Sequence, residues 1–265
     1  MAIWRISRKF PLALLLVGLV CSAPGYVREV SATDITITGQ FNFTDNRSAN
    51  PAGAVPGYFI AVGATSIVPS GVGTTAQATQ GATTVPVPFI PSTIFPDNYF
   101  AAVFDLTLTG VWTLTATDAA GPVSVQTNSI PAPEKIPLVN SPQVSGALLT
   151  PHVSWTLPDF TGLGVTRILI RVRDLDHLVN GVNADIIFSS ASLAANATSF
   201  DVPAGVLAPG KHYSFDILVD NIVEGFLRNR SETFTGIYAT PEASTLFLLG
   251  AGVVALRMRR RQSRS

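Results

Sequence analysis

The chain has 265 residues, 47% of them apolar and only 13% charged, whereas about a quarter of the residues in an average soluble domain are charged. Nine of its 17 basic residues lie before residue 29 or after residue 256, which leaves residues 33–240 with eight basic and fifteen acidic residues, a net charge of −7. That charge excludes a nucleic-acid-binding protein, which needs a basic surface. Because the single cysteine, Cys21, lies in a leader, the mature chain has no disulfide, thiolate metal site or cysteine nucleophile.

The N-terminus has the features of a secretory signal peptide. Three basic residues precede the apolar run 12–20, which is shorter than the roughly 20 residues that a membrane-spanning helix needs. Small or tolerated residues before the cut favour cleavage by signal peptidase after Ala32, so we predict that residues 1–32 are removed. Cleavage after Ala23, a lipid anchor on Cys21 and an uncleaved N-terminal anchor are the alternatives.

Residues 33–130 are predicted to form a first β-sandwich domain. Residues 35–44 alternate between apolar and polar side chains, which is the pattern of a half-buried strand with its polar side chains facing outward. Residues 99–106 and 111–117 repeat this pattern. Residues 63–93 are rich in Gly, Thr, Ser and Pro, so we predict an irregular insertion or a long hairpin there.

A second β-sandwich domain is predicted over residues 131–239. It follows the stretch 128–137, whose three prolines are typical of a linker. The predicted strands are 143–149, 152–157, 166–174, 185–190, 198–202, 212–220 and 230–237. Seven strands in about 100 residues is the number expected of an immunoglobulin-like sandwich.

The second domain carries a closer resemblance. Trp155 lies near the front of the second predicted strand, and Leu207 precedes Tyr213 by six positions, with Pro209 and Gly210 between them. This arrangement is similar to the tyrosine corner of fibronectin type III domains, in which the tyrosine hydroxyl caps the backbone of the preceding turn. The resemblance implies structural roles for Trp155, Leu207 and Tyr213.

In a fibronectin-like sandwich the third and sixth strands are antiparallel neighbours. One register aligns the apolar and charged positions of residues 166–174 with those of residues 212–220. It pairs Arg167 with Asp220, Leu169 with Leu218, Ile170 with Ile217 and Arg171 with Asp216. Since a slip of one residue would turn the apolar set outward, we predict this register and expect the arginines to serve sheet pairing.

The C-terminus has three parts in a fixed order. The tripeptide Pro241, Glu242 and Ala243 comes first, and the apolar run 246–256 follows. The chain then closes with Arg257, Arg259, Arg260, Arg261 and Arg264. The run is predicted to insert in the membrane as a short helix, with the arginines held on the cytoplasmic side by the positive-inside rule.

This tail, residues 240–265, resembles a PEP-CTERM sorting signal, although Ala243 stands where that family usually has proline. The resemblance implies a Gram-negative host that makes exopolysaccharide, and recognition by exosortase, a transpeptidase of the inner membrane. The tail would be cut near residues 241–243. The body would then be released or transferred to the cell surface, the outer envelope or the extracellular matrix. An ordinary tail anchor is the alternative.

The sequence contains no recognisable catalytic or cofactor-binding motif, so neither an enzyme nor a cofactor is predicted. His152, His177 and His212 are not at metal-ligand spacing from one another. Asp174 and Asp176 lie beside His177 after a predicted strand, which leaves calcium binding by loop oxygens as an alternative to a solvated turn.

The favoured function is a non-catalytic structural or adhesive role in the exopolysaccharide layer. A carbohydrate-binding module is the alternative, and it needs exposed aromatic side chains on one face or loop rim. The candidates for that face are Tyr58, Phe59, Phe95 and Tyr99. A secreted hydrolase is the third hypothesis, which would require a deep pocket with converging carboxylates.

Overall fold

A computed structural model describes residues 34–242, with residues 72, 131–132 and 180 left out. Within these residues the chain forms strands and turns but no helix, which confirms the all-β prediction. Accordingly, no helix in the described part is long and apolar enough to cross a membrane. The predicted signal peptide, the cut after Ala32 and the predicted tail helix lie outside the described residues.

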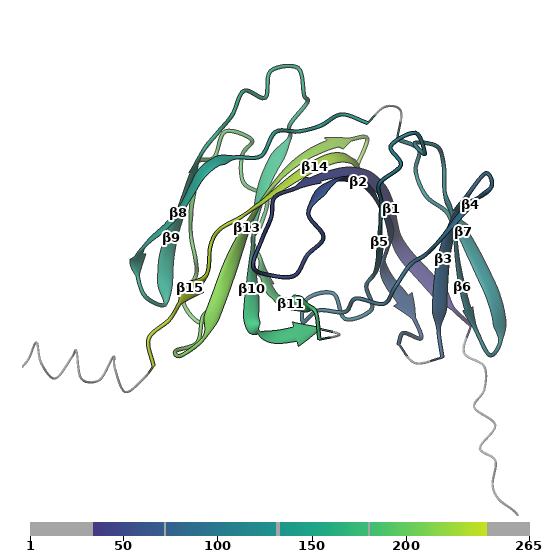
Figure 1. Cartoon of the computed structure of the whole chain (residues 1–265), viewed down its shortest axis with the longest axis horizontal. Coiled ribbons are helices and arrows are strands. Elements are labelled where there is room, and N and C mark those ends of the chain that lie inside the picture. Colours follow the sequence, from purple (N-terminus) through teal and green to yellow (C-terminus); the bar gives the residue numbers. More distant parts are fainter. Residues whose placement is uncertain (1–33, 72, 131–132, 180, 243–265) are drawn as a thin grey trace, which may run out of the picture. The chain divides into compact units, whose positions relative to one another are not determined.

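The strands form three sheets (Figure 1). The large sheet has the order β11-β10-β13-β14-β1-β2-β5, and β15 also pairs with β13. Its members are β1 (Thr36–Arg47), β2 (Gly57–Val68), β5 (Tyr99–Val103), β10 (Arg167–Val179), β11 (Asn183–Ser189), β13 (His212–Val223), β14 (Phe226–Phe234) and β15 (Tyr238–Ala239). A four-stranded sheet contains β3 (Thr75–Gln80), β4 (Thr83–Pro86), β6 (Thr113–Asp118) and β7 (Gly121–Gln126), and a three-stranded sheet contains β8 (Asn140–Ala147), β9 (Thr150–Thr156) and β12 (Ser199–Asp201).

The large sheet contains strands from both predicted sandwiches. Strand β1 pairs with β14 in parallel, with Thr44 opposite Asn229 and Arg47 opposite Glu232. The other described pairs in this sheet are antiparallel. Residues 33–130 and 131–239, which the sequence suggested as tandem domains, therefore meet along one continuous sheet.

Each half of the chain nevertheless has its own hydrophobic core. The first core packs the four-stranded sheet on β2 and β5, around side chains such as Trp112 and Leu114. The second packs the three-stranded sheet on β10 and β13, around side chains such as Trp155 and Phe215. The large sheet thus supplies one wall to both cores.

The predicted pairing of β10 with β13 is confirmed. Arg167 lies opposite Asp220, Ile170 opposite Ile217, and Arg171 opposite Asp216, with Leu169 and Leu218 also paired as expected. All seven strands predicted for the second half are present, as β8 to β14. Strict alternation along β10 and β13 determines this register, because a slip would bury charges in the second core.

The three residues behind the fibronectin resemblance all lie in the second core. Trp155, Leu207 and Tyr213 are buried there. The Tyr213 hydroxyl accepts a hydrogen bond from the backbone N–H of Ala208 at 2.8 Å, within the preceding turn. The Trp155 indole donates to the carbonyl oxygen of Ala197 at 2.9 Å. Both polar groups therefore find a partner while their rings fill the core.

Of the two alternatives predicted for residues 63–93, the structure shows a hairpin and not an irregular insertion: the described residues contain the end of β2 and the antiparallel pair β3 and β4. Strand β2 itself was not expected. Its central residues 59–64 are buried on both faces of the sheet, so they form a continuous run of small and apolar residues without the period of two that marks a half-buried strand.

The described residues of the proline-rich stretch 128–137 contact β1 of the large sheet. The side-chain amide of Asn46 donates to the carbonyl of Ile136 at 2.8 Å, and Asn42 donates to the carbonyls of Gly110 and Asn128 at 3.0 and 3.2 Å. The prediction that the polar side of β1 faces outward is therefore wrong at Asn42 and Thr44, both of which are fully buried. The Thr44 hydroxyl lies 2.7 Å from the side-chain amide of Asn229 on β14 and donates to the carbonyl of Glu134 at 3.4 Å. The side-chain oxygen of Asn42 has no hydrogen-bond partner in the described structure.

Substitution of Gly63 by alanine tests the close approach of β2 and β5. A Cβ at this position would collide with the carbonyl oxygen of Tyr99 and lie 3.0 Å from the Phe41 ring. We expect Gly63→Ala to lower the free energy of unfolding by roughly 1–3 kcal/mol, measured by urea denaturation. Gly236→Ala is the control, because nothing lies within 4 Å of the added methyl group. Equal stability of the two variants would contradict this close packing.

Candidate functional site

The large sheet turns one face toward the two cores and gathers ionised side chains on the other. On β13, Phe215, Ile217 and Val219 belong to the second core, so Asp216 and Asp220 point the opposite way. We call this opposite side the inner face. Its charged residues are Asp45, Arg47, Arg167, Arg171, Arg173, Asp216, Asp220, Arg230 and Glu232, supplied by β1, β10, β13 and β14.

Glu232 lies at the centre of this group. Its carboxylate is 2.7 Å from Nε of Arg47 on β1 and 3.1 Å from Nη2 of Arg173 on β10. Arg47 also contacts Asp45 at 2.7 Å, and Arg173 contacts Asp216 at 2.5 Å. One chain of ion pairs therefore runs from the first half of the sequence to the second, through side chains that are at most 10% exposed.

A second cluster surrounds Asp220. Arg230 binds both of its carboxylate oxygens, at 2.7 and 3.1 Å, which is the two-pronged geometry that suits a guanidinium. Arg167 adds a contact at 2.9 Å from β10. Asp220 is fully buried, and although burial opposes its ionisation, the charges of Arg230 and Arg167 hold its pKa below the usual range.

The two carboxylates beside Arg173 have opposite pKa shifts. Burial also opposes ionisation of Glu232, but Arg47 and Arg173 outweigh it and keep the pKa of Glu232 well below its ordinary value. At Asp216, burial dominates over the attraction of Arg173 and raises the pKa to about 7. The Oδ1 atom of Asp216 has no hydrogen-bond partner in the described structure, which leaves the charge on that side uncompensated.

Arg171 differs from the other four arginines of the inner face. Each of those four forms an ion pair, whereas Arg171 forms none with any described residue. Its guanidinium instead lies over the ring of Phe95, 5.5 Å from the ring centre, and its buried Nε has no hydrogen-bond partner among the described residues. Burial, together with repulsion from Arg230, lowers the pKa of Arg171 to about 10.

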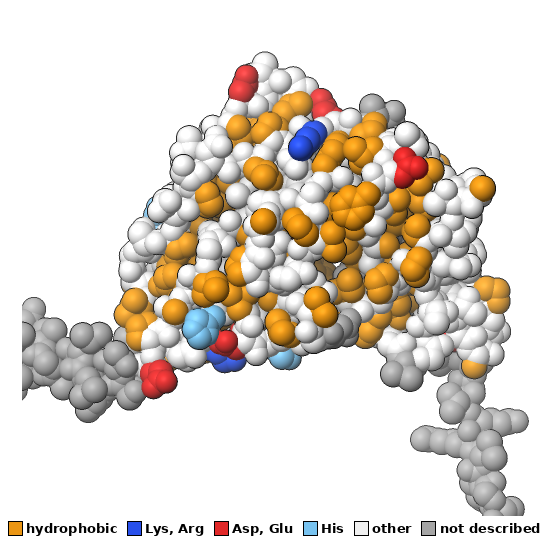
Figure 2. All heavy atoms as spheres, viewed as in Figure 1, with side chains coloured by type: hydrophobic (Ala, Val, Ile, Leu, Met, Phe, Trp, Pro, Cys, Tyr) orange, Lys and Arg blue, Asp and Glu red, His pale blue; other side chains and the backbone are white. Residues whose placement is uncertain are grey.

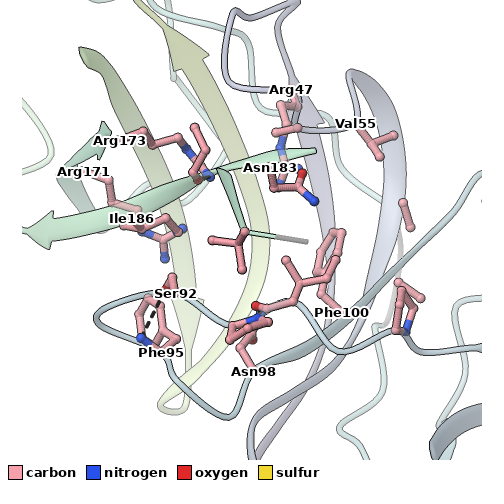
Figure 3. Close-up of a pocket in the computed structure, with 18 of the residues that line it drawn as sticks. Arg47, Val55, Ser92, Phe95, Asn98, Phe100, Arg171, Arg173, Asn183 and Ile186 are labelled. Carbon is pink, nitrogen blue, oxygen red and sulfur yellow. Dashed lines mark hydrogen bonds between the residues drawn. The ribbon is translucent and has the colours of Figure 1, made fainter. Parts of the chain in front are cut away.

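A cavity of about 500 Å³ adjoins the inner face (Figure 3). Its polar lining consists of Arg47, Ser92, Asn98, Arg171, Arg173 and Asn183. The rest of the lining is apolar and includes Pro86, Pro88, Pro91, Phe95, Phe100 and Phe104. The cavity is therefore a largely apolar space with guanidinium groups along one wall, and it is open on one side.

Two contacts hold the walls of the cavity together. The backbone N–H and hydroxyl of Thr93 donate to the Asp185 carboxylate of β11 at 2.7 and 2.6 Å. The N–H of Ala184 donates to the carbonyl of Ala52, in the loop between β1 and β2, at 2.9 Å. The loops before β2 and β5 are thereby hydrogen-bonded to β11, which lies at the opposite end of the strand order from β5 in the same sheet.

The aromatic residues predicted to form an exposed ligand face do not do so. Phe59 on β2 and Tyr99 on β5 are almost fully buried, and because they belong to different packing clusters they lie on opposite faces of the large sheet. Tyr58 and Phe95 are half-buried, and of these four side chains Phe95 alone lines the cavity. Their apolar rings fill interior space, which the sequence could not distinguish from exposure.

Sequence reasoning did not identify the other cavity residues. Arg47, Arg171 and Arg173 sit in alternating strands where a charged side chain normally indicates the solvent side. The available signal was the match of Arg171 with Asp216 on the neighbouring strand, which sequence reasoning assigned to sheet pairing. Nothing local marked Ser92, Asn98 or Asn183, because they reach the cavity through loops and strand ends.

The histidines and nearby acids pair with one another. His212 Nδ1 lies 3.0 Å from Asp176, and His177 Nδ1 lies 2.9 Å from Asp185, while Asp174 contacts Lys211 at 3.4 Å. Within the described ranges no three His, Cys, Asp or Glu side chains come together as a metal site. The suggested calcium ligands Asp174, Asp176 and His177 therefore have separate partners.

The described chain is hydrogen-bonded to the body as far as Pro241, at the start of the predicted sorting signal. Strand β15 pairs with β13 at His212 and Tyr213, and the carbonyl of Pro241 accepts a hydrogen bond from the N–H of Gly210 at 3.0 Å. Glu242 is the last described residue. Ala243, Arg257, Arg259, Arg260 and Arg261 lie outside the described residues.

Replacement of Glu232 by glutamine tests the ion-pair chain. Without the shared carboxylate, Arg47 keeps only Asp45 and Arg173 keeps only Asp216, and the inner face holds five arginines against three acids. We therefore expect Glu232→Gln to lower the free energy of unfolding by roughly 3–5 kcal/mol. Urea denaturation followed by circular dichroism measures the loss. The control is Glu224→Gln in the exposed β13–β14 turn, which should change stability by less than about 0.5 kcal/mol. Similar values for both variants would rule out this role for Glu232.

Asp216→Asn tests the raised pKa of Asp216. Since that pKa lies above its unfolded value, the contribution of Asp216 is complete at low pH and is lost as pH rises through about 7. Between about pH 4 and 7 the wild type should lose up to about 1.4 kcal/mol per pH unit relative to the neutral Asn variant. Denaturation of both proteins across that range measures the difference, in which the shared histidines cancel. A constant difference would show that Asp216 is ionised throughout.

Three comparisons with known proteins complete the description of the chain. Residues 239–261 match the PEP-CTERM protein-sorting motif. No curated protein matches the chain. A solved structure of a cytokine receptor complex covers 80% of this chain and 100% of its own, at 15% identity and a TM-score of 0.27. The sorting motif indicates an exported bacterial protein that is targeted to exosortase.

Proposed function

We propose that the exported body is a non-catalytic structural or adhesive protein of the cell surface or extracellular matrix of a Gram-negative bacterium, delivered there by exosortase. The observation that carries the proposal is the sorting motif at residues 239–261. Membrane insertion and exosortase processing of the tail, and a place in an exopolysaccharide layer, are parts of the same proposal.

The junction between body and motif supports this arrangement. The motif begins at Ala239, the last residue of β15, and Thr240 donates a hydrogen bond through its hydroxyl to the carbonyl of Ala208 at 2.7 Å. The folded body therefore extends to the first residues of the motif. Removal of the tail after Pro241 would leave β15 and its contacts with β13 intact.

The other hypotheses receive less support from the geometry. The carbohydrate-binding alternative required an exposed aromatic face, yet Phe59 and Tyr99 are buried. The hydrolase alternative required converging carboxylates in a pocket, and the described lining of the cavity holds arginines instead. The structural or adhesive role is therefore the hypothesis that we retain.

Mass spectrometry of both termini of the protein from its native host tests the delivery. We expect the mature chain to begin after Ala32 and to end near residues 241–243. Replacement of Arg257, Arg259, Arg260 and Arg261 by glutamine should leave the tail attached, because it removes the positive charge that orients the segment. Recovery of the wild-type chain from the cytosol with these arginines still present would refute the proposal.

A matched control separates the sorting defect from general damage. Arg228→Gln removes a positive charge from the body at β14, outside the motif, and should leave both termini as in the wild type. The proposed role itself is tested by comparing a strain that lacks the protein with its complemented form. We expect the deletion strain to retain fewer cells in its extracellular matrix. Equal retention would refute the structural role while leaving the sorting intact.

A further inference from the structure

The inner face has one more positive charge than negative. Five arginines, at positions 47, 167, 171, 173 and 230, face four acids, at positions 45, 216, 220 and 232. The four acids all form ion pairs with the other four arginines, and Arg171 has no ion-pair partner among the described residues. A half-buried guanidinium without a counter-ion is costly, and any anion that reached it would be bound strongly in this poorly hydrated setting.

Arg171 is also placed where a ligand could reach it. It lines the cavity together with Arg47 and Arg173, and every carboxylate that neutralises those two lies outside the described lining. Figure 3 shows the Arg171 side chain extending toward Phe95 and Ser92 at one wall of the cavity. The hydroxyl of Ser92 accepts a hydrogen bond from the N–H of Phe95 at 3.1 Å, which holds this wall in position beside the guanidinium.

The remaining walls determine what the rest of a ligand must be. Phe95, Phe100 and three prolines present flat apolar surfaces to the cavity. At its open side, Val55 and Phe104 are 40% and 58% exposed. An apolar surface of this kind is stabilised by contact with an apolar partner. A volume of about 500 Å³ is also within the usual range for small-molecule sites, roughly 300–1,000 Å³.

We propose that this cavity binds a small amphipathic organic acid, whose single carboxylate pairs with Arg171 and whose apolar, preferably planar, body packs against Phe95 and Phe100. The planar guanidinium matches a carboxylate in a two-pronged arrangement. One unpaired cation favours a singly charged ligand. The amides of Asn98 and Asn183 supply polar contacts at the edge of the same space. This inference stands on the inner face alone and does not depend on the sorting role.

Calorimetric titration of the purified full-length chain tests the proposal with two probes of the same shape. The first is 1-naphthoate, which carries the carboxylate, and the second is 1-naphthamide, its neutral counterpart. We expect 1-naphthoate to bind at least about tenfold more tightly than 1-naphthamide, because only the acid forms a charge-assisted pair with Arg171. Sodium acetate, which lacks the apolar body, should bind more weakly than 1-naphthoate.

Two variants of β10 assign the preference to one side chain. Arg171→Gln should abolish the difference between 1-naphthoate and 1-naphthamide. Arg167→Gln is the matched control, since it removes the same charge from the same strand but lies outside the cavity lining, and Asp220 keeps Arg230 as its partner. It should retain the preference. Thermal unfolding establishes that both variants are folded.

A third variant tests the place of binding without altering any charge. Ala102→Phe adds a ring to the cavity wall at β5 and should weaken binding of both probes at least about tenfold. The proposal is overturned if 1-naphthoate fails to bind at about 1 mM. It is equally overturned if both probes bind alike, if Arg171→Gln keeps the preference for the acid, or if Ala102→Phe leaves binding unchanged.

Discussion

The ion pairs made by Glu232 connect the two halves of the chain within the large sheet. This carboxylate lies on β14 and pairs with Arg47 on β1 and with Arg173 on β10, so three strands from both halves of the sequence converge on one buried charge. Removing any member would leave an uncompensated charge in the interior, a penalty larger than the gain from forming the pair. The network therefore favours one mutual arrangement of the halves over the many that hydrophobic packing alone would allow.

The parallel joint between β1 and β14 depends on that constraint. Each half has a core of its own, and among the described residues only two small apolar clusters combine residues of both halves. In these, Phe234 packs with Ala52 and Ala54, and Leu227 packs against Phe43 and Phe59. The strands that meet at the joint carry polar side chains on both faces. On the core side, Asn42 and Asn46 donate to the backbone carbonyls of residues 110, 128 and 136, and on the inner face the charged side chains pair across the strands. Polar pairing therefore acts together with these small apolar clusters in specifying where the halves join.

The alternation of apolar and polar residues along each strand determined how much of the fold could be predicted from the sequence. The seven strands of the second half and the register of β10 on β13 follow from period-two patterns, because each of those strands has one core face and one polar face. Strand β2 was missed because both of its faces are buried, which removes the alternation. The joint was missed because Thr44 and Asn229 lie 185 positions apart, and no local pattern records a pairing over that distance. The cavity was missed for the same reason, since its walls come from three separate stretches of chain.

The low charge of the sequence also has a structural explanation. Nine of the 23 ionisable acids and bases between residues 33 and 240 belong to the inner face, and the surface in view in Figure 2 is mostly uncharged, with scattered hydrophobic side chains. A large share of the charged side chains of this protein therefore lies on the inner face of the large sheet and not on the outer surface. In such a network a single unmatched residue matters, because solvent cannot screen it as it would at the surface. Arg171 is that residue. Because it has no ion-pair partner among the described residues and lines a largely apolar cavity, an anion bound in the cavity would compensate its charge.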